Sequence, residues 1–130
     1  MKRRTLIGAS AAAGFLASGP AIANASRPLL VYVGGWDCPS CITWKNSKKP
    51  DFLASPLAKK VRLVEVEAPK LREAYQPGYW PDDVKFVLEL IPKEQRRGTP
   101  RFLIVRGGKI VLNRWGGGEW DRVAASLQKL

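Results

Sequence analysis

The sequence predicts an α/β fold in which a central mixed β-sheet is flanked by α-helices. Segments with the apolar runs or alternation of strands recur along the chain, and segments with helical spacing separate them. Two of these strand segments flank a glycine turn, as in a β-hairpin, and an amphipathic segment closes the chain. The order strand, helix, strand, helix-containing segment, strand, strand, helix is typical of layered α/β domains.

Each element is expected from the hydrophobic pattern and from the glycines and prolines that punctuate it. Pro50 is expected to interrupt the first helix, because proline lacks the N–H that a helix interior needs. Asp51 or Ser55 is expected to cap the second helix. The elements are strand 29–33, ended by Gly34-Gly35, helix 42–49, helix 51–60, strand 61–67, a helix after Pro81-Asp82-Asp83, strand 101–105, strand 109–115 and a closing helix over 119–130.

Residues 1–25 have the features of a cleaved signal peptide. A basic start at Lys2-Arg3-Arg4 precedes an apolar segment, and an A-x-A site ends at Ala25, where cleavage is expected. The apolar segment is shorter than the roughly 20 residues that a membrane anchor needs. The paired arginines resemble a twin-arginine export signal, and ordinary secretion stays open as the alternative.

The remaining segment, 26–130, has the size of one domain with an insert around 68–97. Cleavage removes three positive charges from a net charge of +11, so this domain stays basic. Its lysines and arginines are scattered, which favours a solvated basic surface over a nucleic-acid partner.

The chain has two cysteines, Cys38 and Cys41, and no histidine. A disulfide between them closes a very short loop and would constrain the unfolded chain little. A structural zinc site needs four ligands, so one chain cannot complete it, and no metal is expected. The remaining interpretation is a dithiol that cycles between thiol and disulfide.

Cys38 stands at the junction of a predicted strand and helix, with Pro39 in the first helical turn. Unpaired N–H groups and the helix dipole stabilise negative charge there. We therefore expect Cys38 to be an exposed nucleophile, and Cys41, one turn along, to be more buried.

These features resemble the thioredoxin-like family over nearly the whole of 26–130. The matching features are the apolar strand 29–33, Trp36 near Cys38-Pro39-Ser40-Cys41, Gly98-Thr99-Pro100 before a strand, the Gly107-Gly108 hairpin and the glycines before the last helix. The resemblance implies a thioredoxin-like fold and a thiol-disulfide oxidoreductase. Within the family the chain is most similar to small exported thioredoxins that reduce bacterial periplasmic clients, including those associated with sulfur oxidation.

The resemblance also implies roles for individual residues. Cys38 and Cys41 would form the redox-active disulfide and act catalytically. Pro100 would be a cis proline facing the cysteines, and Thr99 would pair with an extended client backbone. Trp36 would contact the client.

The resemblance implies an exported periplasmic protein that is monomeric and uses no cofactor. Its expected partners are protein clients with disulfides or thiols and an inner-membrane thiol carrier that supplies electrons. No nucleic acid is expected.

The chain departs from the family pattern at several positions. Many thioredoxins carry a buried acid six residues before the first cysteine, where this chain has Tyr32. Glu65 or Glu67 would replace that acid, or would simply be solvated charges. Asp37 would oppose a thiolate on Cys38. Pro39-Ser40 between the cysteines leaves the direction of electron flow open, although reduction is the expected direction.

Several alternatives stay open. The aromatic residues of the insert, Tyr75, Tyr79 and Trp80, would bind a client or anchor their loop to the core. The two thiolates suit a Cu(I) carrier that borrows further ligands from another molecule. The chain would otherwise be a binding module of the same fold or a basic adaptor whose cysteines merely pair.

Overall fold

A four-stranded mixed β-sheet forms the centre of the computed structural model, which describes residues 27–130. Its strands are β2 (Leu29–Gly35), β3 (Arg62–Ala68), β4 (Arg101–Arg106) and β5 (Lys109–Trp115). They lie in the order β3-β2-β4-β5, with β2 parallel to β3 and the two other pairs antiparallel. The predicted signal peptide lies outside the described residues.

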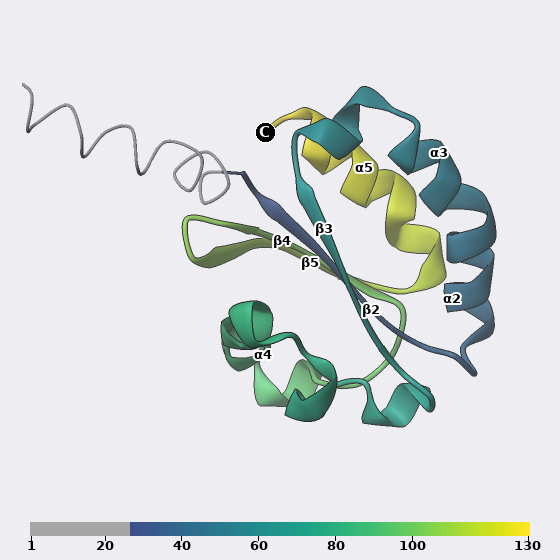
Figure 1. Ribbon diagram of the computed structural model, residues 1–130, viewed down its shortest axis with the longest axis vertical. Coiled ribbons are helices and arrows are strands. Elements are labelled where there is room, and N and C mark those ends of the chain that lie inside the picture. Colours follow the sequence, from purple (N-terminus) through teal and green to yellow (C-terminus); the bar gives the residue numbers. More distant parts are fainter. Residues whose placement is uncertain (1–26) are drawn as a thin grey trace, which may run out of the picture.

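Helices cover both faces of this sheet (Figure 1). On one face lie α2 (Pro39–Thr43), α3 (Lys49–Leu53) and the C-terminal helix α5 (Trp120–Gln128), and on the other lies α4 (Lys85–Leu90). The predicted α/β fold with a mixed sheet between helices is confirmed. Across residues 27–130 there is no helix with the length and apolar character needed to cross a membrane.

The predicted strands and the closing helix are present at nearly the expected positions. Gly107 and Gly108 turn the β4-β5 hairpin with φ values of 61° and 76°, a left-handed conformation that glycine adopts without steric conflict. Helix α5 buries Trp120, Val123 and Leu127 against the sheet, as its spacing predicted. The boundaries of β3 and β4 differ from the expected ones by one residue, and the largest difference is at β2, which continues through Gly34-Gly35 because both glycines pair with β3.

The prediction that Pro50 interrupts the first helix is wrong. Helical structure continues from α2 through a π-turn (Trp44–Lys48) into α3, where Pro50 occupies an early position. In the π-turn the Lys49 N–H reaches the Trp44 carbonyl, five residues back. A wider turn directly before a proline relieves the clash that its ring would make with a regular helix. The second predicted helix, 51–60, is instead the end of α3 followed by a 3-10 turn, Pro56–Lys59.

Two hydrophobic cores fill the spaces between sheet and helices. Side chains of β2 alternate between them, so that Leu30 and Tyr32 face one core while Val31 and Val33 face the other. The disulfide-side core consists of Leu30, Tyr32, Cys38, Cys41, Trp44, Phe52, Val61, Phe102, Ile104, Trp120, Val123 and Leu127. The α4-side core consists of Val31, Val33, Val64, Val66, Ala68, Ala74, Trp80, Val84, Val87, Leu88, Ile91, Leu103 and Val105.

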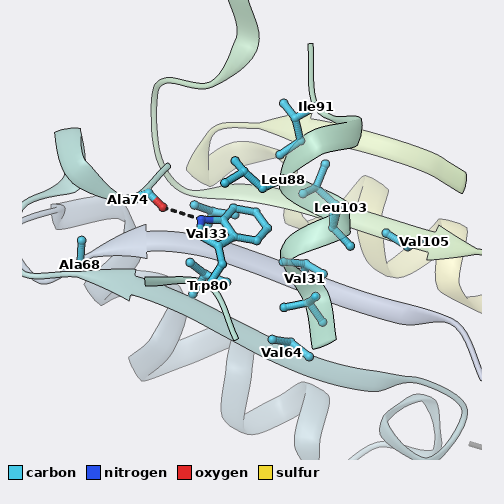
Figure 2. Packing of buried hydrophobic residues seen from close by; sticks show 13 residues of the cluster. Val31, Val33, Val64, Ala68, Ala74, Trp80, Leu88, Ile91, Leu103 and Val105 are labelled. Atoms are coloured by element: carbon cyan, nitrogen blue, oxygen red, sulfur yellow. Dashed lines mark hydrogen bonds between the residues drawn. The ribbon is translucent and has the colours of Figure 1, made fainter. Parts of the chain in front are cut away.

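The insert 68–97 packs against the α4-side core. A 3-10 turn (Asp82–Val84) after Pro81 leads into α4, which agrees with the predicted helix start. Trp80 is buried and its indole N–H donates to the Ala74 carbonyl at 2.8 Å (Figure 2). The loop therefore has its own buried anchor.

Candidate active site

The site begins where β2 ends and α2 starts. A disulfide joins Cys38 and Cys41, whose Cα atoms lie 5.2 Å apart. Cys38 is the N-cap of α2, Pro39 occupies the first turn, and the Cys41 N–H donates to the Cys38 sulfur at 3.2 Å. A backbone donor aimed at this sulfur stabilises negative charge on it once the disulfide opens.

Both sulfurs are covered in this disulfide form. Cys38 is 2% exposed and Cys41 is fully buried. The expectation of an exposed Cys38 is therefore wrong for the oxidised protein, because the disulfide turns its sulfur inward toward Cys41 and the disulfide-side core. Residues on either side of Cys38 are exposed, among them Trp36, Pro39 and Ser40. The exposed surface next to Cys38 is therefore formed by these residues.

Thr99-Pro100 lies at the same end of the sheet and has a cis peptide bond, as the resemblance implied. Val33 pairs with Arg101 in the antiparallel β2-β4 ladder, so the chain at Pro100 adjoins Gly34 one step further along. A Cβ on Gly34 would lie 3.1 Å from the Cys41 sulfur. The register therefore brings the proline and the disulfide together.

The glycine turn before α5 completes this arrangement. The Gly116 N–H donates to the Pro100 carbonyl at 2.8 Å. A Cβ on Gly117 would come 3.0 Å from the Cβ of Ser40, between the two cysteines. The turn consequently links the cis-proline segment to the disulfide loop. Within the described residues, the Thr99 backbone forms no hydrogen bond to another backbone group.

Trp36 lies beside Cys38 with 64% of its surface exposed. Its backbone N–H donates to the Ala68 carbonyl at 3.0 Å, which fixes the main chain while the ring stays in solvent. A cavity of about 230 Å³ next to the ring is lined by Gly35, Trp36, Ile42, Lys45, Asn46 and Glu67.

Asp37 has a partner that the sequence did not indicate. Its carboxylate accepts the Leu71 N–H at 2.7 Å. Gly35 packs closely on the backbone of the same residue, where a Cβ would meet the Leu71 Cα at 2.5 Å. Asp37 thus ties the disulfide loop to the start of the insert, besides placing negative charge near Cys38.

Tyr32 occupies the position of the buried acid and is itself fully buried. Its hydroxyl donates to Glu67 Oε2 at 3.0 Å, and Lys45 Nζ donates to both oxygens of Glu67 at 2.8 and 3.0 Å. Burial, and then the nearby Glu67 carboxylate, raise the pKa of Tyr32 above its ordinary value. Of the two glutamates considered from the sequence, Glu67 therefore reaches the site, whereas Glu65 pairs with Lys49 Nζ at 2.7 Å.

The aromatic residues of the insert anchor it to the protein. The Tyr75 hydroxyl donates to the Gly98 carbonyl and accepts from Arg101 Nε, both at 2.8 Å. Burial raises the pKa of Tyr75, while the Arg101 guanidinium acts in the opposite direction. Tyr75 therefore supports the residue before Thr99-Pro100 and, like Trp80, fits the anchoring interpretation.

Sequence reasoning missed Lys45 and Arg101, and it named Tyr75 without its Arg101 partner. Lys45 follows Cys41 by four residues, a spacing that places both on one helical face, so its proximity was readable from the pattern. Arg101 follows Pro100 in a strand and is only 6% exposed, with Nη1 donating to Asn113 Oδ1 at 2.6 Å. Nothing in the sequence distinguished it from the many surface arginines.

Within the described part of the chain, His, Cys, Asp and Glu side chains form no group of three or more that could hold a metal ion. The Cys38–Cys41 pair is the sulfur chemistry that the described geometry brings to this end of the sheet. Two sulfurs, a backbone donor and a cis proline thus lie together at one end of an α/β fold, in which helices cover both faces of a mixed four-stranded sheet and a C-x-x-C disulfide stands at the start of α2.

No known family model matches the chain, and no curated protein matches it. Among solved structures it is similar to Trxlp from Edwardsiella tarda EIB202, with 19% sequence identity, a TM-score of 0.49, and coverage of 82% of this chain and 90% of that one. The α/β fold itself is assigned from the strand order and from the helices on both faces of the sheet.

Proposed function

We propose that this protein is a periplasmic thiol-disulfide oxidoreductase that reduces disulfides in protein clients. The disulfide at the start of α2, with the Cys41 N–H directed at the Cys38 sulfur, is the observation that carries this proposal. An N–H donor favours the thiolate of Cys38 over that of Cys41, so Cys38 is assigned as the nucleophile.

The reaction proceeds by two thiol-disulfide exchanges. The Cys38 thiolate attacks one sulfur of the client disulfide, forming a mixed disulfide and releasing the other client sulfur as a thiolate. Cys41 loses its proton and attacks Cys38, which forms the Cys38–Cys41 bond and releases the second client thiolate. The client gains two electrons and two protons, and the protein is left oxidised.

The free backbone of Thr99, next to Pro100, suits an extended client segment that adds to the sheet end. Trp36 offers an exposed ring on the other side of Cys38. An exported reductant works among oxidised proteins, so we propose that a thiol carrier in the inner membrane returns it to the dithiol form.

Trapping tests this proposal directly. Cys41→Ser should retain its client as a mixed disulfide on Cys38, and Cys38→Ser should retain none. Both variants should lose dithiol-dependent reduction of insulin while keeping the circular dichroism of the native fold. Turnover in either variant, or trapping through Cys41 instead, would contradict the assignment.

A further inference from the structure

Resolution of a mixed disulfide requires Cys41 to lose a proton from a buried position. The Cys41 side chain has no solvent exposure and lies in the disulfide-side core. Burial in apolar surroundings disfavours a thiolate, and water does not reach the sulfur directly. A path for this proton must therefore pass through neighbouring protein groups.

The Tyr32 hydroxyl is the polar group that the strand geometry brings to Cys41. Tyr32 and Gly34 lie on the same face of β2, so the tyrosine ring extends over the glycine. A Cβ on Gly34 would collide with the Tyr32 hydroxyl oxygen and lie 3.1 Å from the Cys41 sulfur. The hydroxyl and the sulfur thus border the same small space, which only the missing side chain of Gly34 leaves open.

From Tyr32 the hydrogen bonds continue to Glu67. Gly34 pairs with Glu67 in the parallel β2-β3 ladder, which places the carboxylate within reach of a hydroxyl lying over the glycine. Tyr32 donates to Glu67 Oε2 at 3.0 Å, and Lys45 fixes the carboxylate with two hydrogen bonds. The glutamate side chain is 17% exposed and lines the 230 Å³ cavity beside Trp36.

We propose that Tyr32 and Glu67 form a proton relay that connects Cys41 with the solvent in this cavity, with Lys45 as the positioning residue. The inference rests on the proposed function and deepens it. In the resolving step, the Cys41 thiol passes its proton to the Tyr32 oxygen while Tyr32 passes its own proton to Glu67. The Cys41 thiolate then attacks Cys38, and the proton leaves Glu67 for water. Protons move the other way when the disulfide is reduced.

The charges around the relay favour this assignment. Tyr32 keeps its proton at neutral pH, because burial and the nearby Glu67 raise its pKa, so it conducts a proton without becoming an anion. The charged groups of the surrounding elements are Glu65 and Glu67 on β3, Lys45 in the π-turn and Lys49 on α3. The other two elements around the disulfide-side core, β4 and α5, contribute the apolar side chains of Phe102 and Trp120 to it.

A two-phase reaction with an aromatic disulfide such as 5,5′-dithiobis(2-nitrobenzoate) separates the steps. Attack by Cys38 on the reagent releases the first thionitrobenzoate, and attack by Cys41 on the mixed disulfide releases the second. Stopped-flow absorbance measures both rates across pH in the reduced protein. The variants are Tyr32→Phe, which keeps the ring and removes the hydroxyl, and Glu67→Gln, which keeps the shape and removes the base. Glu65→Gln on the same strand is the matched control.

We expect Tyr32→Phe and Glu67→Gln each to slow the second phase at least tenfold at neutral pH, since positioned proton transfer contributes about 10²-fold or more. The deficit should shrink at alkaline pH, where Cys41 is ionised before the step begins and no longer needs the relay to accept its proton. The first phase should not change, and the double variant should be no slower than the slower single variant. The Glu65→Gln protein should behave as wild type.

Three results would overturn the relay. They are wild-type second phases in both Tyr32→Phe and Glu67→Gln, an equal loss in Glu65→Gln, or a loss that is the same at every pH and therefore structural. If Tyr32→Phe fails to fold, Glu67→Gln still decides the question, because Glu67 lies at the partly exposed end. A wild-type protein without a second phase would instead contradict the proposed function itself.

Discussion

The face of the sheet that carries the disulfide is packed with aromatic rings, whereas the opposite face is packed mainly with aliphatic side chains. Tyr32 stacks on Trp44 with ring centroids 4.5 Å apart, and Trp44, Phe102 and Trp120 lie within 5.4 Å of one another. Among the described residues, the α4-side core has Trp80 as its only buried aromatic ring, and valine, leucine, isoleucine and alanine side chains make up the rest of its buried members.

This difference suits the two faces to different roles, reactivity on the disulfide-side and stability on the α4-side. An aromatic ring with a hydroxyl occupies a core position and still offers a polar atom at a fixed place, as Tyr32 does next to Cys41. Aliphatic side chains offer burial alone. We therefore expect changes on the α4-side to alter stability and changes on the disulfide-side to alter reactivity.

The largest expected effect is on the stability of the α4-side. Leu88→Ala should lower the free energy of unfolding by about 2–5 kcal/mol, because Leu88 is buried in a packed core and the substitution leaves a cavity. Urea unfolding followed by tryptophan fluorescence measures the change. Leu90→Ala, at an exposed position of the same helix, is the control and should shift stability by less than about 0.5 kcal/mol.

The same variant tests the division between the faces. Insulin reduction per folded molecule should be unchanged in Leu88→Ala at a temperature where the protein stays folded. A fall in turnover that parallels the loss of stability would show that the two faces are energetically coupled.

The next effect concerns the two sulfurs of the disulfide-side. In the reduced protein, iodoacetamide should modify Cys38 at least tenfold faster than Cys41, a difference of about 1.4 kcal/mol in activation free energy. The Cys41 N–H supports the Cys38 sulfur, while Cys41 lies in the core near Tyr32 and Trp44.

Mass-mapped labelling across pH measures this selectivity, and the urea-unfolded protein is its control, because both thiols should then react alike. Equal rates in the folded protein, or faster modification of Cys41, would reject Cys38 as the nucleophile.

The smallest expected effect is a loss of folding stability at alkaline pH. The folded protein holds the proton of Tyr32 above the ordinary tyrosine pKa of about 10, so stability from this group is complete below pH 10 and falls as the pH rises further. One such group contributes up to about 1.4 kcal/mol per pH unit. Urea midpoints at pH 7 to 11 should therefore fall more steeply for wild type than for Tyr32→Phe.

Glu67→Gln provides the control for this measurement, since removing the nearby negative charge eases ionisation of Tyr32 and should reduce the slope. Parallel curves for all three proteins would show that Tyr32 ionises as freely in the folded protein as in the unfolded chain.

The sequence predicted the parts of this molecule that depend on local pattern. The alternation of apolar and charged residues predicted β3, the Gly107-Gly108 pair predicted the β4-β5 hairpin, and the helical spacing of apolar residues predicted the buried side of α5. The cis bond at Pro100 came from the resemblance, not from the pattern.

The missed features depend on partners that are distant in the sequence. Tyr32 meets Glu67 through the register of two parallel strands, and register is not visible in either strand alone. Tyr75 and Arg101 meet through folding of the insert against β4. Pro50 misled the helix prediction because a single wide turn removes the conflict that proline normally causes.

That wide turn also sets the rotational phase of the helix. A regular α-helix advances about 100° per residue, so residues eight apart, such as Trp44 and Phe52, point about 80° away from each other. The π-turn takes up one additional residue and reduces this angle to roughly 20°. Both rings therefore pack on Trp120, at 5.4 and 5.6 Å. The number of residues in this segment, and not only their identity, determines which side chains reach the disulfide-side core.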